Sequence, residues 1–122
     1  MNILLAEDNE DNYMVIRSNL RRSNPPVELI WTENGEEALK KLEEKVFDLV
    51  LLDIQMPVMD GMETIRRIRG DARFKDLPVV AVTASVFAEM KEGYMSEGFD
   101  AVLEKPFSRQ ELLDLIERYR PA

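Results

Sequence analysis

Short apolar runs alternate with helical patterns along the whole chain, and this alternation constrains the fold more than any other feature of the sequence. Continuous apolar runs cover residues 3–6, 49–52, 79–82 and 101–103, and an alternating run covers 27–32, as in a partly exposed edge strand. A helical pattern follows each run. Five strands that alternate with five helices predict an α/β fold, with an open, mostly parallel sheet covered on both faces.

Helix start signals and apolar stripes place the expected helices. Asn34 and Asp60 each precede a glutamate by three residues, and Ser108 with Glu111 forms a capping box. We expect the other two helices over residues 9–22 and 87–97. The apolar spacing predicts these buried faces: Tyr13, Ile16 and Leu20; Leu39, Leu42 and Val46; Ile65 and Ile68; Leu112, Leu115, Ile116 and Tyr119.

The residue types that the chain lacks exclude several kinds of chemistry. It has no cysteine and no histidine, so disulfide scaffolds, zinc–thiolate sites and Ser-His-Asp catalysis are excluded. A net charge of -8 argues against nucleic acid as a direct partner, because phosphate contacts need clustered Lys and Arg.

The length and the N-terminal residues bear on organisation and location. The 122 residues fit one domain, which we expect to cover residues 1–122. The N-terminus has no basic segment followed by a long apolar stretch, and no apolar run is long enough to span a membrane. We therefore expect a cytoplasmic protein without a membrane anchor.

Polar residues follow four of the five expected strands. Glu7 and Asp8 follow the first, Asp53 the third, Thr83 the fourth and Lys105 the fifth. In open α/β sheets, ligands bind outside the carboxyl ends of the strands, so we expect these side chains to converge on one crevice. Each residue alone has an ordinary explanation as a loop, cap or surface residue. The joint arrangement is what favours a site.

The chemistry of this set points to a cation and a phosphoryl group. Three carboxylates would repel one another unless a hard cation such as Mg²⁺ lay among them. Lys105 and Thr83 suit phosphoryl oxygens, as a charge and as a hydroxyl donor. Without histidine, cysteine or an obvious serine nucleophile, a carboxylate is the natural covalent acceptor. Asp53 is the best placed, because it ends the most apolar strand.

Four motifs make the chain resemble the receiver domain of two-component response regulators, including single-domain chemotaxis-type regulators and the receivers of hybrid histidine kinases. They are Leu-Leu-Ala-Glu-Asp-Asn at 4–9, Leu-Leu-Asp-Ile-Gln-Met-Pro-Val-Met-Asp-Gly at 51–61, Val-Thr-Ala at 82–84 and Glu-Lys-Pro-Phe at 104–107. The second is highly specific, and the resemblance covers nearly the whole chain. It implies a flavodoxin-like (βα)5 fold, a doubly wound five-stranded parallel sheet with strand order 2-1-3-4-5.

The resemblance also implies roles for the candidate residues. Asp53 would accept a phosphoryl group from a phosphohistidine on a histidine kinase or a histidine phosphotransfer protein. Asp8, Asp53 and the backbone carbonyl of Gln55 would bind Mg²⁺ directly, and Glu7 would act through water. Thr83 and Lys105 would bind the phosphoryl oxygens, and the peptide bond after Lys105 would be cis. The chain would be a phosphorylation-dependent switch and not a conventional enzyme.

One position departs from the family pattern. Many receivers carry Tyr or Phe three residues before the lysine, and here that residue is Val102. A valine cannot rotate inward as such a ring does, so we expect signalling either to rely on loop and helix shifts around Ser85–Met90 or to be muted. The expected output surface is the face formed by the fourth helix, the fifth strand and the fifth helix. We also expect Gln55 and Ser85 to tune the attack of water on the acyl phosphate.

Three alternatives remain open at this stage. An aspartyl-phosphate phosphohydrolase of the haloacid-dehalogenase type would need a second aspartate where Gln55 stands. A flavodoxin-like cofactor carrier would not place acids at 7–11, where they would repel phosphate. An interaction module that is never phosphorylated is favoured only by Val102. No effector region follows residue 122, so we expect output through a downstream protein that the sequence does not identify, unless the chain is part of a larger protein.

Overall fold

Five parallel strands form one sheet in the order β2-β1-β3-β4-β5, as predicted. The computed structural model describes residues 1–21, 23, 25–84 and 88–121. Its elements, in chain order, are β1 (Asn2–Ala6), α1 (Glu10–Leu20), β2 (Glu28–Thr32), α2 (Gly35–Glu44), β3 (Leu49–Asp53), α3 (Gly61–Arg69), the 3₁₀ turn η1 (Ala72–Phe74), β4 (Val79–Thr83), α4 (Ala88–Glu97), β5 (Ala101–Glu104) and α5 (Arg109–Tyr119).

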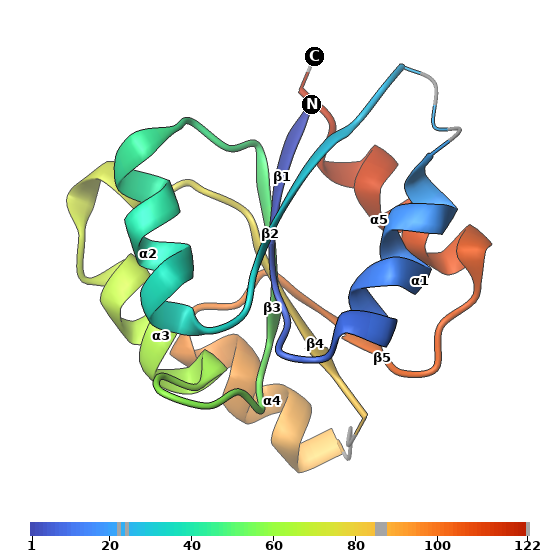
Figure 1. The fold of residues 1–122 in the computed structure, drawn as a ribbon. Coiled ribbons are helices and arrows are strands. Elements are labelled where there is room, and N and C mark those ends of the chain that lie inside the picture. The colour runs from blue at the N-terminus through green and yellow to red at the C-terminus, as the bar shows by residue number, and fades with distance from the viewer. Residues whose placement is uncertain (22, 24, 85–87, 122) are drawn as a thin grey trace.

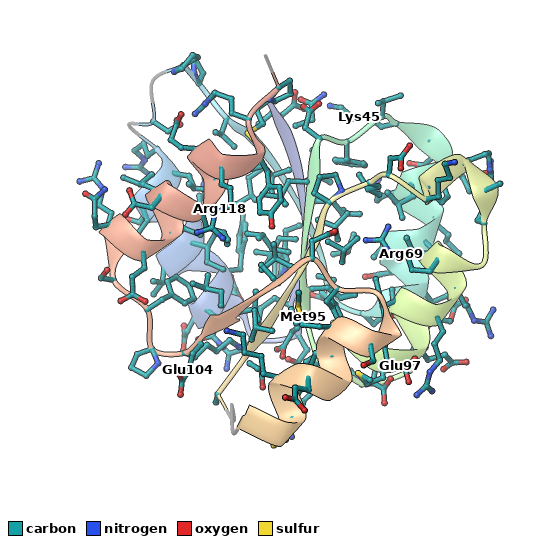
Figure 2. The ribbon with its side chains drawn as sticks, turned by 180° about the vertical axis from the view of Figure 1, so that it is seen from behind. Lys45, Arg69, Met95, Glu97, Glu104 and Arg118 are labelled. Carbon is teal, nitrogen blue, oxygen red and sulfur yellow. The ribbon has the colours of Figure 1, made fainter. Side chains whose placement is uncertain are left out.

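Helices cover both faces of the sheet. Figure 1 shows α1 and α5 on one face and α2, α3 and α4 on the other. Successive strand residues point to opposite faces, so Leu4 and Ala6 enter one core while Ile3 and Leu5 enter the other. The same alternation holds in β3 and β4, which explains why these central strands are apolar up to their last residues, Asp53 and Thr83. The two cores fill the space between the sheet and the helices (Figure 2).

Side-chain caps begin four of the helices. Asn9, Asn34, Asp60 and Ser108 each accept a hydrogen bond of 2.9–3.1 Å from the backbone N–H three residues later. Ser108 completes a capping box with Glu111, as predicted. These caps fix where α1, α2, α3 and α5 begin relative to the ends of the preceding strands.

The predicted buried stripe of the second helix is wrong at its last position. The helix ends at Glu44, and the next residue, Lys45, has extended backbone angles. Val46 therefore no longer follows the helical spacing, and its side chain is 83% exposed. Phe47 takes the core position instead. The fourth helix is described from Ala88, so the predicted start at Phe87 lies outside the described residues.

The register of the strands brings the polar residues that follow them to one edge. The pairing of β1 with β3 places Glu7 level with Asp53. The pairings of β3 with β4 and of β4 with β5 bring Thr83 and Lys105 to the same edge. This edge lies at the carboxyl ends of the strands, where a doubly wound sheet forms its crevice.

None of the helices in the described part of the chain is long and apolar enough to cross a bilayer.

Candidate functional site

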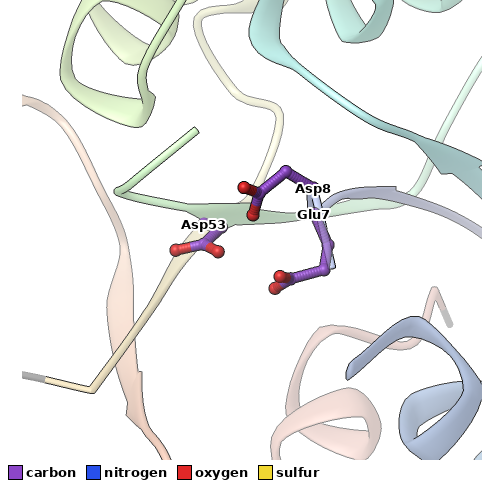
Figure 3. Close-up of side chains that lie close together, drawn as sticks. All are labelled: Glu7, Asp8 and Asp53. Atoms are coloured by element: carbon purple, nitrogen blue, oxygen red, sulfur yellow. The ribbon is translucent and has the colours of Figure 1, made fainter. Parts of the chain in front are cut away.

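Three carboxylates meet at the carboxyl ends of β1 and β3 (Figure 3). Glu7, Asp8 and Asp53 each offer one oxygen, and these oxygens lie within 4.8 Å of one another. Glu7 is only 1% exposed and Asp53 6%, whereas Asp8 is exposed. The predicted convergence of these three residues is therefore observed. Two of the acids are shielded from water, and the third opens the cluster to solvent.

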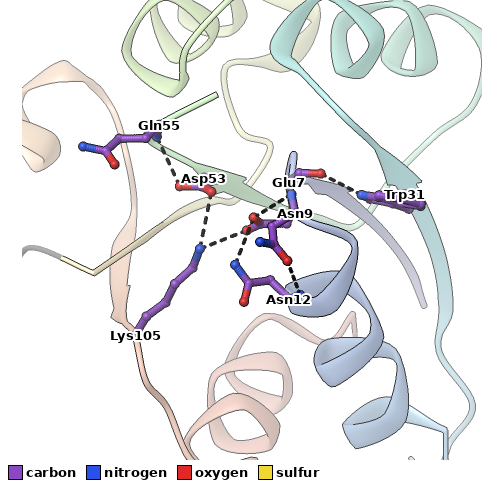
Figure 4. Close-up of polar contacts among 7 residues, drawn as sticks. All are labelled: Glu7, Asn9, Asn12, Trp31, Asp53, Gln55 and Lys105. Atoms are coloured by element: carbon purple, nitrogen blue, oxygen red, sulfur yellow. Dashed lines mark hydrogen bonds and ion pairs between the residues drawn. The ribbon is translucent and has the colours of Figure 1, made fainter. Parts of the chain in front are cut away.

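Glu7 is held by contacts on both carboxylate oxygens (Figure 4). Its Oε1 accepts hydrogen bonds of 3.2 Å from the backbone N–H of Asn9 and from Nδ2 of Asn12. Its Oε2 lies 3.0 Å from Nζ of Lys105. Asn12 was not among the sequence candidates. No sequence signal points to it, because its contact with Glu7 depends on how α1 is rotated relative to the end of β1.

Asp53 lies between Lys105 and the backbone of the loop that follows β3. Its Oδ1 accepts the N–H of Gln55 at 3.1 Å, and its Oδ2 lies 3.3 Å from Nζ of Lys105. The pKa of Asp53 is raised to about 6, first because burial disfavours the charged carboxylate and second because the charge of Glu7 is close. The Lys105 charge and the Gln55 N–H oppose this rise.

Lys105 links the two buried carboxylates. Its side chain is 20% exposed. Burial alone would lower its pKa, but the hydrogen bond to Glu7 and the charges of Asp53 and Glu7 outweigh burial, so the pKa of Lys105 lies above its usual value. The backbone N–H of Lys105 donates to the carbonyl of Thr83 at 2.8 Å. The Lys105–Pro106 peptide bond is cis, as the family resemblance implied.

The site opens into a cavity of about 290 Å³ at the edge of the sheet. Thr83, which is itself buried at the end of β4, contributes to its wall. All the metal-binding and phosphate-binding candidates named from the sequence line this one cavity: Glu7, Asp8, Asp53, Gln55, Thr83 and Lys105. Asn9, Asn12 and Ala84 complete the lining.

The donor set fits a hard divalent cation. When all are ionised, the three carboxylates and the ammonium of Lys105 leave an excess of two negative charges. Carboxylates from Asp and Glu with access to water are the ligands that Mg²⁺ prefers. The exposed position of Asp8 leaves room for water molecules on the ion. The cluster therefore has the composition, charge and solvent access of a magnesium site.

Val102 lies in β5, half-buried against the core under α4. The segment expected to shift, Ser85–Met90, falls partly outside the described residues, because 85–87 are not described. The expected contribution of Ser85 beside Gln55 falls outside them as well.

Comparison with protein families gives one match over nearly the whole chain. The model for the response regulator receiver domain matches residues 3–117. Among known proteins, the aerobic respiration control sensor protein ArcB of Escherichia coli strain K12 is 39% identical over 120 residues. The autoinducer 2 sensor kinase/phosphatase LuxQ of Vibrio vulnificus is 35% identical over 120 residues. Each alignment covers 98% of this chain but only 15% of ArcB and 14% of LuxQ.

Solved structures give the same result. The chemotaxis response regulator CheY4 of Vibrio cholerae superposes with a TM-score of 0.88 at 27% identity, covering 98% of both chains. The receiver domain of sensor histidine kinase PA1611 from Pseudomonas aeruginosa superposes with a TM-score of 0.87 at 32% identity, covering 97% of this chain and 95% of that one. The PA1611 structure has a magnesium ion coordinated in its active site cleft.

Proposed function

The chain belongs to the response regulator receiver family, and from that premise we propose that it accepts a phosphoryl group on Asp53 and signals through contacts with other proteins. Receiver domains are switch domains of two-component systems and not conventional enzymes. We infer that residues 1–122 form one receiver domain. The chain spans only 15% of the length of ArcB and 14% of the length of LuxQ.

The observation that carries this proposal is the environment of Asp53. Its carboxylate is buried at the end of the central strand, next to one lysine and two further acids. Shielded like charges repel, so clustering three acids costs free energy. A carboxylate with only a structural role would not need this cluster. An acceptor of a phosphoryl group does need it, since the acids can hold a metal and the lysine can hold phosphoryl oxygens.

The proposed reaction is a direct transfer between two side chains. A carboxylate oxygen of Asp53 forms a bond to phosphorus while the bond between phosphorus and the imidazole nitrogen of a phosphohistidine breaks. The electron pair of the broken bond stays on the imidazole. Mg²⁺, when bound, would neutralise charge on the phosphoryl oxygens. Glu7, Asp8, Asp53 and the Gln55 carbonyl would hold the ion, Glu7 through water.

Lys105 and Thr83 would bind the phosphoryl oxygens after transfer. The Lys105 ammonium already lies 3.3 Å from Asp53 and would exchange a carboxylate for a phosphoryl oxygen. The Thr83 hydroxyl would donate a hydrogen bond from the end of β4. These contacts would be stronger in one arrangement of the loops than in another, so phosphorylation would shift the population between them. With Val102 in β5, we propose that this shift proceeds without an aromatic ring.

The phosphoryl donor would be a histidine kinase or a histidine phosphotransfer protein. The similarity to ArcB and LuxQ, both named as sensor proteins, supports a place in such a relay. The output surface, which would contact a downstream protein, would be formed by α4, β5 and α5. Gln55, which is exposed beside Asp53, would influence how fast water hydrolyses the acyl phosphate.

Intact mass spectrometry tests the proposal directly. The protein is incubated with acetyl phosphate, with and without Mg²⁺, alongside Asp53→Asn and the control Asp76→Asn, which makes the same change at an exposed position. We expect one phosphoryl adduct that depends on Mg²⁺, is absent from Asp53→Asn and persists in Asp76→Asn. A folded protein that binds Mg²⁺ yet forms no adduct would instead be an interaction module.

A further inference from the structure

The indole of Trp31 donates a hydrogen bond to the backbone at the centre of the acidic cluster. Its Nε1 lies 2.7 Å from the carbonyl oxygen of Glu7 (Figure 4). Building on the proposed function, we propose that Trp31 is a positioning residue for the metal-binding acids. It would act by fixing the peptide that joins Glu7 to Asp8, without touching the metal or the phosphoryl group.

The contact lies where the ladder between β1 and β2 ends. The last strand pair is Ala6 with Thr32, and the N–H of Glu7 still donates to the carbonyl of Thr32 at 2.9 Å. The carbonyl of Glu7 accepts the hydrogen bond from the side chain of Trp31, which lies within β2. The peptide groups on both sides of the Glu7 Cα are therefore hydrogen-bonded just beyond the strand, and the Trp31 indole holds the one that joins Glu7 to Asp8.

The indole itself is held in place by a second aromatic ring. Tyr13 on α1 stacks on Trp31, with ring centroids 4.3 Å apart and an interplanar angle of 5°. The ring thus packs between a strand and a helix, and its N–H has little freedom to leave the Glu7 carbonyl. Two elements far apart in the sequence contribute to one backbone orientation.

Asp8 is the residue that depends most on this orientation. Among the residues that the structure describes, its side chain makes no hydrogen bond or ion pair, and it is exposed. Glu7, by contrast, is held by Asn9, Asn12 and Lys105. The place of the Asp8 carboxylate beside Asp53 is therefore set by its backbone, and the Trp31 N–H is the side-chain contact that fixes this backbone.

The test removes the indole N–H and leaves the ring in place. Trp31→Phe keeps an aromatic ring, and replacement of Trp31 by 3-benzothienylalanine keeps the bicyclic shape with sulfur in place of N–H. Tyr13→Leu is the matched control, because it removes the stacking but leaves the hydrogen bond to Glu7. Mg²⁺ affinity is measured by calorimetry, and phosphorylation by acetyl phosphate is measured at low and at saturating Mg²⁺.

We expect both replacements of Trp31 to raise the dissociation constant for Mg²⁺ about tenfold, as is typical when an outer contact that orients metal ligands is lost. The phosphorylation rate should fall at low Mg²⁺ and recover at saturating Mg²⁺. Tyr13→Leu should lower thermal stability with a smaller effect on the dissociation constant. In the unmodified protein, the indole N–H resonance of Trp31 should shift when Mg²⁺ is added.

Each contrary result has a distinct meaning. Wild-type Mg²⁺ affinity in both Trp31 replacements would overturn the positioning role and leave the proposed function intact. Equal weakening by Tyr13→Leu with an unchanged indole N–H resonance would overturn it as well, because packing and not the N–H contact would then explain the effect. If the Trp31 indole N–H resonance of the unmodified protein did not shift when Mg²⁺ was added, that result would also contradict the positioning role. A native protein that binds no Mg²⁺ would overturn the proposed function together with this role.

Discussion

The ammonium of Lys105 lies 3.3 Å from the Asp53 carboxylate, although 52 residues separate them in the chain. Lys105 also reaches Glu7, so one cation holds together the ends of three strands. In the absence of a metal, this contact is the main compensation for two shielded negative charges. The same ammonium is the group expected to bind the phosphoryl oxygens, so its stabilising and signalling roles are separable by experiment.

Replacement of Lys105 by Met should keep the fold but weaken the response to phosphorylation. The methionine preserves the apolar part of the side chain and removes the charge. We expect a loss of about 2 kcal/mol in the free energy of unfolding without metal, because a hydrogen-bonded charge partner is removed. Acetyl phosphate should still label Asp53, but NMR shifts that depend on phosphorylation should become smaller.

Lys41→Met is the matched control for this prediction. Lys41 pairs with Glu44 on the exposed surface of α2, where an ion pair contributes little. Its loss should change the free energy of unfolding by less than about 1 kcal/mol and leave the phosphorylation shifts unchanged. Full phosphorylation shifts in Lys105→Met would remove Lys105 from the proposed coupling.

The pKa of Asp53 predicts an unusual dependence of stability on pH in metal-free protein. The folded protein holds this proton up to about pH 6, whereas an unfolded aspartate loses it near pH 4. Between these values the folded state binds more protons than the unfolded state. The contribution of Asp53 to the free energy of unfolding therefore falls as pH rises from about 4 to about 6, by up to about 3 kcal/mol.

Urea unfolding in the presence of a chelator measures this effect. Other charged groups line the same site, so the informative quantity is the difference in the free energy of unfolding between the unmodified protein and Asp53→Asn. The variant should be more stable at pH 7, and its advantage should disappear toward pH 4. Saturating Mg²⁺ should reduce the advantage at pH 7. A difference that does not vary with pH would contradict the raised pKa.

The site residues predicted from the sequence share one property, which is that they lie at or just beyond the carboxyl ends of strands. Asp53 and Lys105 could be assigned because parallel strands end at the same edge, whatever the details of packing. Asn12 and Trp31 could not, because their contacts with Glu7 depend on the phase of α1 and on the register of β2 against β1. Val46 was misplaced because the helix ends two residues before it.

The loop after β3 contains a valine in a strained backbone conformation. Val58 has a φ of 68°, and its side chain is 73% exposed. A β-branched residue rarely adopts this left-handed conformation, whereas Asn tolerates it. We expect Val58→Asn to raise the free energy of unfolding by about 1 kcal/mol, because the strain is relieved and little apolar contact is lost. Chemical denaturation checks this value.

Val46→Asn is the control for the effect of the new side chain. Val46 is also a highly exposed valine, and it is not among the described residues with positive φ. Its replacement should change stability by less than about 0.5 kcal/mol, as for most surface substitutions. If the two variants have equal effects, strain at Val58 is not the cause.

Arg69 joins α3 to the segment between α4 and β5 (Figure 2). Its guanidinium donates to the carbonyls of Phe74, Leu77 and Gly98 at 2.8–2.9 Å, and its Nη2 lies 2.8 Å from Asp100. This arrangement depends on the absence of a side chain at Gly98. The φ of Gly98 is 117°, and a Cβ there would lie 2.6 Å from Cγ of Arg69.

Gly98→Ala should therefore destabilise the protein by about 2–3 kcal/mol, from backbone strain and from displacement of the Arg69 side chain. The same substitution at Gly93 should have the opposite effect on stability. Gly93 lies inside α4, and a Cβ there would meet nothing within 4 Å. Alanine should stabilise that helix by about 0.5–1 kcal/mol. Thermal unfolding of both variants distinguishes the two cases, and destabilisation by both would mean that the space around Arg69 is not the cause.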